Sequence, residues 1–136
     1  MNSVVHFEVT AKDTDRAKKF YGGVFDWKFQ EMGGEYGNYI VCQTTETDEQ
    51  RMPKRKGAIN GGMMKVDPTA KHTILTIAVD NMEESLEKVK ANGGKVISEI
   101  MDIPNVGRYA RIEDSEGNVV SLMEPTAEYK EKAKSL

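Results

Sequence analysis

The sequence predicts an α+β domain in which two βαβββ modules form a half-open curved sheet around a cleft. Each half of the 136 residues shows the same order of patterns, with an alternating strand, a helical apolar stripe and three further strands. A shift of 68 residues also carries Val9 to Ile77 and Asp13 to Asn81. A repeat at half the chain length indicates two copies of one unit. We expect one domain, 1–136. It consists of a first module at 1–66, a second module at 71–125 and a helical tail at 126–136.

The first module opens with a strand in which Phe7 and Val9 alternate with His6 and Glu8. Asp13 is the expected N-cap of the following helix. Its apolar stripe has helical spacing and consists of Ala17, Phe20, Tyr21 and Val24. Three strands are predicted at 25–29, 36–43 and 57–66. The charged segment 44–56 is predicted to be a solvated loop, the alternative being a loop that covers a substrate or binds a partner.

The second module repeats this order. A strand at 73–79 precedes a helix that Asn81 caps, with Glu84 completing a capping box and Gly93 in the C′ position. Met82, Leu86 and Val89 form the apolar stripe of this helix. Strands are predicted at 95–101, 108–113 and 118–124, and a short charged helix at 128–134. Each predicted sheet has a helix on one face and a less apolar opposite face, so the two sheets are expected to enclose the cleft.

Composition excludes several classes of protein. The chain has 19 Lys and Arg against 22 Asp and Glu, a net charge of −3, so it lacks the basic surface typical of nucleic-acid binding. A single cysteine excludes an internal disulfide and a thiolate zinc site. The longest apolar stretch, near 74–79, is far shorter than the ~20 residues that cross a membrane. The first residues do not have the pattern of a secretory signal, so a cytoplasmic protein is expected.

Several short motifs carry a resemblance to a known family, and they lie at 6–9, 15–27, 79–81, 93–96, 103–110 and 114–118. Their order and spacing resemble the vicinal-oxygen-chelate superfamily, which holds glyoxalase I, bleomycin and fosfomycin resistance proteins and extradiol dioxygenases. Two residues depart from its pattern. Asp26 stands where glycine is usual after the first helix, and Ser115 replaces proline in the turn before the last strand.

The resemblance also implies where a divalent metal would bind. Enzymes of this superfamily usually hold the metal from symmetric positions on the concave sheet face, and a glyoxalase-like arrangement has four, with His or Gln at the first, Glu at the second, His at the third and Glu at the fourth. The matching positions here are His6, Gly62 (or its neighbour Gly61), Ile74 and Ser121. A catalytic metal normally needs about three protein ligands, and only His6 is a strong one. We therefore expect no metal cofactor, and a divalent metal in a rearranged site is the alternative.

The polar residues of the expected cleft are the candidate site. His6 and Glu8 share a strand face and are candidate catalytic residues, for ligand binding or proton transfer. A hydrogen-bonded structural histidine and a structural salt link are the alternatives. Tyr36, Tyr39 and Tyr109 are able to line the pocket with a polar tip. The residues expected to line the ligand cleft are Thr76, Ser121, Met123 and Tyr109.

Four other residues are assigned structural roles. His72 is expected at the surface near the end of a strand, and Cys42 is expected to be a small buried apolar residue. Arg108 and Arg111 are interpreted as surface charges, with binding of an anionic substrate as the alternative.

The resemblance implies a protein that binds an unidentified small molecule in its cleft and forms a homodimer. One alternative is an enzyme of the lyase or dioxygenase type, with altered metal ligands or with His6 and Glu8 as its reactive groups. Another is a resistance protein that sequesters a drug without chemistry. Fold does not decide between these functions, because function depends on the site.

Overall fold

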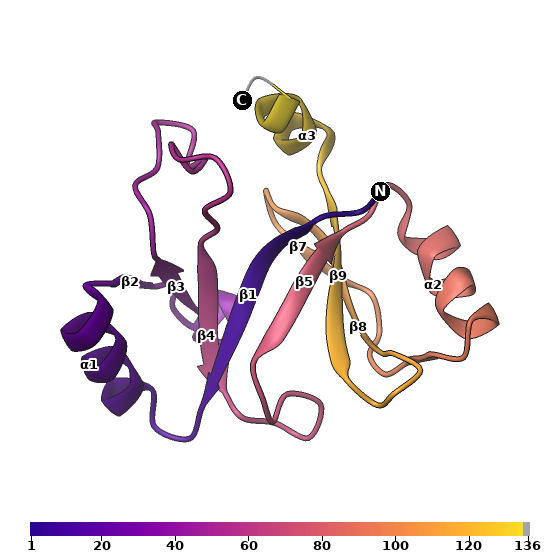
Figure 1. The fold of residues 1–136 in the computed structure, drawn as a ribbon, viewed down its shortest axis with the longest axis horizontal. Helices are drawn as coiled ribbons and strands as arrows, with labels where there is room; N and C mark the ends of the chain where they lie inside the picture. Colours follow the sequence, from indigo (N-terminus) through magenta and orange to yellow (C-terminus); the bar gives the residue numbers. More distant parts are fainter. Residues whose placement is uncertain (135–136) are drawn as a thin grey trace. The chain divides into compact units, whose positions relative to one another are not determined.

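A computed structural model describes residues 1–134 of the chain (Figure 1). The chain divides into two compact units. The N-terminal unit is His6–Thr73, and the C-terminal unit joins Met1–Val5 to the chain from Ile74 onward. None of the helices in the described part is long and apolar enough to cross a membrane.

The N-terminal unit holds a sheet of four strands in the order β2-β3-β4-β1. β1 and β4 are parallel, whereas β3 is antiparallel to both β2 and β4. The elements are β1 (Val4–Ala11), whose first two residues group with the other unit, α1 (Thr14–Phe25), β2 (Lys28–Glu31), the 3₁₀ turn η1 (Gly34–Tyr36), β3 (Ile40–Gln43) and β4 (Gly61–Lys65).

Helix α1 begins as predicted but ends later than predicted. The Asp13 carboxylate accepts a hydrogen bond from the Arg16 N–H at 3.0 Å, which confirms Asp13 as the N-cap. The helix continues to Phe25 and ends where Asp26 takes a left-handed conformation, φ 59°, with its N–H bonded to the Gly22 carbonyl. The prediction of a strand at 25–29 was wrong at its start, because β2 begins only at Lys28.

Two other strands of this unit are shorter than predicted. The predicted strand 36–43 starts at Ile40, since the Tyr36 N–H bonds the Gly33 carbonyl and closes a 3₁₀ turn. The predicted strand 57–66 starts at Gly61. The charged loop before it is anchored at Met52, whose side chain is buried and whose N–H bonds the Asp48 carboxylate at 2.9 Å.

The core of the N-terminal unit lies on one face of its sheet. Strand alternation brings together the buried residues Val9, Ile40, Cys42 and Met63, against which Phe7, Ala17, Tyr21, Trp27 and Phe29 pack. The indole of Trp27 stacks on the ring of Tyr21, with centroids 4.7 Å apart. α1 contributes Ala17 and Tyr21, so the helix covers this face of the sheet. The opposite face of the sheet is not covered by α1 and can carry polar residues.

The C-terminal unit holds a sheet in the order β5-β9-β8-β6, in which β7 pairs with another part of β8. β5 and β9 are parallel, and β8 is antiparallel to β6, β7 and β9. The elements are β5 (Ile74–Ala78), α2 (Met82–Ala91), β6 (Lys95–Val96), β7 (Met101–Ile103), β8 (Gly107–Glu113), β9 (Val119–Pro125) and α3 (Ala127–Lys134).

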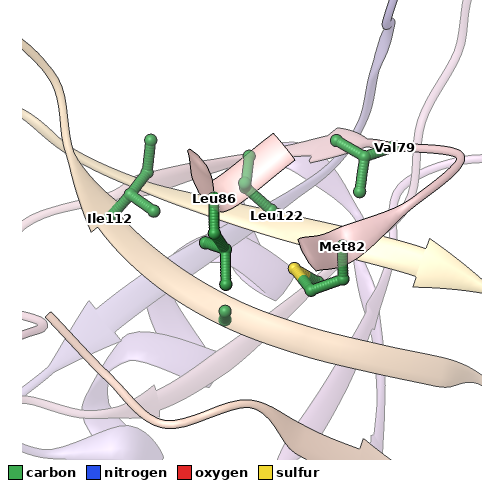
Figure 2. Packing of buried hydrophobic residues seen from close by; sticks show 6 residues of the cluster. Val79, Met82, Leu86, Ile112 and Leu122 are labelled. Carbon is green, nitrogen blue, oxygen red and sulfur yellow. The ribbon is translucent and has the colours of Figure 1, made fainter. Parts of the chain in front are cut away.

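Helix α2 forms as its sequence predicts. The side chain of Asn81 accepts a hydrogen bond from the Glu84 N–H at 3.0 Å, and Gly93 follows the helix with φ 89°, a conformation that favours glycine. Met82 and Leu86 are buried on one side of α2. They pack with Val79, Ala110, Ile112 and Leu122 into the core of this unit (Figure 2).

The strand predicted at 95–101 is split into β6 and β7. Val96 pairs with Ile112 and Met101 with Tyr109, so this side holds two more residues than β8 between the two pairs. The Ser98 hydroxyl accepts a hydrogen bond from the Arg111 N–H at 2.8 Å. A side chain thus replaces a carbonyl in the ladder, and the extra residues form a bulge. The prediction of one continuous strand was wrong for this reason.

Strand register confirms the repeat. Residues 7–10 of β1 pair in parallel with residues 61–64 of β4, and residues 75–78 of β5 pair in parallel with residues 120–123 of β9. The first strands correspond at the predicted shift of 68 residues. The two units therefore have the same architecture, and the predicted α+β fold of two βαβββ modules is confirmed.

Candidate functional site

The face of the N-terminal sheet opposite its core carries His6 and Glu8 on β1. Glu8 pairs in register with Gly62 of β4, which in turn pairs with Val41 of β3. Tyr39 comes two residues before Val41, so alternation places it on this same face. The predicted candidates His6 and Glu8 therefore share a face with Tyr39 and Gly62.

His6 forms a hydrogen bond with Tyr39 across this face. The distance from His6 Nε2 to the Tyr39 hydroxyl oxygen is 2.9 Å. Burial lowers the pKa of His6 to about 4, so its imidazole is neutral at pH 7. A neutral imidazole has one nitrogen that donates and one that accepts, and the tautomer decides which role Nε2 takes toward the phenol.

Gly62 lies between these two side chains. β4 runs between β1 and β3, and a Cβ atom placed on Gly62 would overlap the hydroxyl and ring carbons of Tyr39. The glycine thus leaves room for the Tyr39 ring above β4, where its hydroxyl reaches His6. His6 and Tyr39 were each predicted to line the cleft, but their contact was not predicted. The alternation of Tyr39 with Val41 was the available signal, but the pairing of β3 with β4 was needed to use it.

Glu8 is buried, with 2% of its surface exposed. It lies two residues from His6 on β1 and has interactions of its own within the molecule. A carboxylate at this depth must be paired, hydrated or used by a ligand. On this face His6 forms its hydrogen bond with Tyr39.

The C-terminal sheet has a corresponding polar face. Thr76 of β5 pairs in register with Ser121 of β9, which pairs with Arg111 of β8. Tyr109 and Met123 share this face by alternation. Three of the four predicted cleft residues are buried, namely Thr76, Ser121 and Tyr109, whereas Met123 is half-buried.

A hydrogen-bonded chain links three of these side chains. The Tyr109 hydroxyl lies 2.5 Å from the Ser121 hydroxyl, and Arg111 Nε donates to the Tyr109 oxygen at 3.1 Å. The guanidinium carbon of Arg111 also lies 5.9 Å from the centroid of the Tyr109 ring. Arg111 is only 9% exposed. The interpretation of Arg111 as a surface charge was wrong, because its guanidinium lies against the Tyr109 ring and donates to the Tyr109 hydroxyl on the polar face of β8.

The two units are equivalent at these positions. Gly62 and Ser121 occupy equivalent positions on the last strand of each unit. Gly62 pairs with Val41 and Ser121 pairs with Arg111. In each case a tyrosine, Tyr39 or Tyr109, comes two residues before the paired residue. In each unit, therefore, a tyrosine hydroxyl lies against the residue at which the resemblance places a metal ligand.

The residues at the four implied metal positions do not fit a divalent cation. In the N-terminal unit, His6 bonds Tyr39, and Gly62 offers no side chain. In the C-terminal unit, Ile74 is buried and aliphatic, and the Ser121 hydroxyl bonds Tyr109. Within residues 1–134, no group of three or more His, Cys, Asp or Glu side chains is placed to hold a metal ion.

The remaining sequence candidates lie elsewhere. His72 is exposed and precedes β5. Cys42 is fully buried, and burial raises the pKa of its thiol to about 12, as expected of a structural cysteine. Arg108 donates to the Glu83 carboxylate of α2 at 3.0 Å, which is a surface ion pair.

Comparison with known proteins identifies the family. Residues 3–122 match the model of the Glyoxalase/Bleomycin resistance protein/Dioxygenase superfamily. A glyoxylase-like domain-containing protein of Didymella fabae is 32% identical over 117 residues, which cover 85% of this chain and 88% of the relative. The protein CFP32 of Mycobacterium bovis is 35% identical over 121 residues, and the match covers 87% of this chain and 42% of that relative.

Solved structures share the fold. Methylmalonyl-CoA epimerase from Mycobacterium tuberculosis superposes with a TM-score of 0.62 at 14% identity, over 94% of this chain and 91% of the epimerase. The protein BH1468 from Bacillus halodurans superposes with a TM-score of 0.64 at 17% identity, over 92% of this chain and 95% of that protein. The fold, the repeat and the match over residues 3–122 lead to one conclusion: the chain belongs to the Glyoxalase/Bleomycin resistance protein/Dioxygenase superfamily.

Proposed function

We propose that this protein binds a small polar molecule on the polar face of a sheet, and that binding needs no divalent metal. The observation that carries the proposal is the bond between His6 and Tyr39 above Gly62. His6 is the one strong ligand among the four metal positions of the family. Its partner, the Tyr39 phenol, fills the space that a side chain at Gly62, another of these positions, would occupy. Both groups donate and accept hydrogen bonds, which suits recognition of a polar ligand.

The pKa of His6 favours binding over acid–base catalysis. A general base works best when its pKa lies near the operating pH. Burial holds the pKa of His6 at about 4, so the imidazole is a weak base at pH 7. It remains an effective hydrogen-bonding group. A binding protein is therefore favoured over an enzyme that uses His6 and Glu8.

A thermal-shift screen in EDTA tests the proposal. A panel of small carbonyl compounds, carboxylates and amides is added to the purified protein, and a ligand at 100 times its Kd should stabilise the fold by about 2.7 kcal/mol. That corresponds to a rise in Tm of roughly 8–10 °C for a chain of this length. The rise should shrink in His6→Ala and Tyr39→Phe and persist in Tyr21→Phe, a matched loss of a hydroxyl on the core side of the same sheet. Binding that appears only after Zn²⁺ or Ni²⁺ is added would overturn the proposal.

We also propose that the protein is a cytoplasmic homodimer. The superfamily resemblance implies the dimer, and the buried free thiol of Cys42 is compatible with a reducing compartment. Light scattering at micromolar concentration should give twice the chain mass of 15.2 kDa. A mass of one chain at every concentration would contradict the dimer.

A further inference from the structure

We propose that the polar face of the C-terminal unit binds a carboxylate group of the ligand, through the hydroxyls of Thr76 and Ser121. This inference rests on the proposed metal-independent binding function and adds the chemical class of the ligand. It uses side chains of one unit only.

The first observation is the hydroxyl of Thr76. Thr76 is 1% exposed, and among the described residues its Oγ1 has no hydrogen-bond partner. A buried hydroxyl without a partner is destabilising, and it is uncommon in native proteins. A ligand oxygen at this point would satisfy the hydroxyl.

The second observation is the row of side chains across the sheet. Thr76, Ser121 and Arg111 are register neighbours on β5, β9 and β8. Neighbouring strands are about 4.8 Å apart, so the Thr76 and Ser121 hydroxyls are close enough to contact one carboxylate together. The Ser121 hydroxyl is held at one side by Tyr109.

The direction of the hydrogen bonds makes this row a set of donors. Arg111 Nε can only donate, so the Tyr109 oxygen is the acceptor of that bond. A phenol that accepts from a guanidinium is a strong donor in turn, and Ser121 is its neighbour at 2.5 Å. When Ser121 accepts from Tyr109, its own proton is directed to a ligand. The guanidinium favours a negative charge nearby.

The N-terminal unit differs at each of these positions. Thr76 corresponds to Glu8, Ser121 to Gly62, and Arg111 to Val41. A carboxylate side chain and an aliphatic one stand where the C-terminal unit has a hydroxyl and a guanidinium. The donor array therefore belongs to the C-terminal unit alone.

An NMR titration of ¹⁵N-labelled full-length protein tests the inference. Acetate, pyruvate and benzoate are titrated in EDTA at constant ionic strength, alongside acetamide, pyruvamide and benzamide as neutral analogues. At least one carboxylate should give saturable shifts on β5, β8 and β9, with a Kd about tenfold or more below that of its amide. Thr76→Val should weaken this binding about tenfold or more, and Thr73→Val, at an exposed position before β5, should not.

The ligand-free Thr76→Val protein supplies a second measurement. Valine removes a hydroxyl that has no partner and keeps the shape, so the variant should melt at the wild-type temperature or above it. Lower affinity without lower stability separates ligand contact from a structural role. The inference is overturned if no carboxylate shifts these strands, if amides bind equally well, or if Thr76→Val binds as the wild type does. If polar ligands still bind in EDTA through His6 and Tyr39, the proposed function stands without it.

Discussion

Replacing Gly62 by alanine should destabilise the protein because of one side chain, Tyr39. Gly62 is buried on β4, and its φ lies outside the left-handed range, so the backbone itself accepts alanine. The new methyl group, however, would overlap the Tyr39 hydroxyl and ring. Tyr39 must then move and lose its bond to His6.

The size of the effect follows from three contributions. Loss of a hydrogen bond costs about 0.5–1.5 kcal/mol, and overpacking a buried site costs roughly 1–3 kcal/mol. Replacing glycine in the unfolded chain returns about 0.4–1 kcal/mol. We expect Gly62→Ala to lower the free energy of unfolding by about 2 kcal/mol.

Urea unfolding followed by the fluorescence of Trp27, the one tryptophan of the chain, measures this change in the same unit. Gly23→Ala is the matched control. Gly23 lies in α1, nothing would contact its Cβ within 4 Å, and alanine there should stabilise the helix by about 0.5–1 kcal/mol. In a Tyr39→Ala background, Gly62→Ala should cost less than about 0.5 kcal/mol, since the overlap is gone. An equal cost in both backgrounds, or no cost in either, would refute the reasoning.

Three further predictions concern single side chains. Burial lowers the pKa of His6 from 6.5 to about 4, so the His6 side chain binds a proton more tightly in the unfolded chain than in the folded protein. The free energy of unfolding should therefore be highest above pH 6.5 and lower by about 2 kcal/mol at pH 5. Urea unfolding at both pH values checks this, and a His6→Gln variant with the same loss would contradict it. With its pKa raised to about 12, buried Cys42 should not react with a disulfide reagent at pH 8 until the protein is denatured; rapid labelling of the native protein would count against its burial. Asn81→Ala should lower the free energy of unfolding by about 1 kcal/mol, since it removes the cap of the Glu84 N–H; a change below 0.3 kcal/mol would show that the cap contributes little.

Local signals predicted local structure well. Asp13 and Asn81 were recognised as caps because the capping bond spans three residues, and sequence spacing contains that information. The alternation of Phe7 and Val9 with His6 and Glu8 placed β1, and the shift of 68 residues gave the register of the repeat.

Features that depend on contacts between distant strands were missed. The break between β6 and β7 arises from the Ser98 hydroxyl bonding Arg111 on the facing strand, which no local pattern indicates. The His6–Tyr39 bond joins residues 33 positions apart and needs β4 between them to present a glycine. The burial of Arg111 depends on which face of β8 it occupies, and that follows from the pairing with β9.

Calorimetric titration of Zn²⁺ and Ni²⁺ into dialysed protein tests most directly the proposal that the residues at the four metal positions of the family bind no divalent cation in this protein. His6 supplies a single imidazole, while Gly62, Ile74 and Ser121 supply no carboxylate or second imidazole. We expect no stoichiometric high-affinity binding to the wild type and the same result for His6→Ala. One equivalent of metal bound tightly by the wild type, and lost in His6→Ala, would contradict the claim.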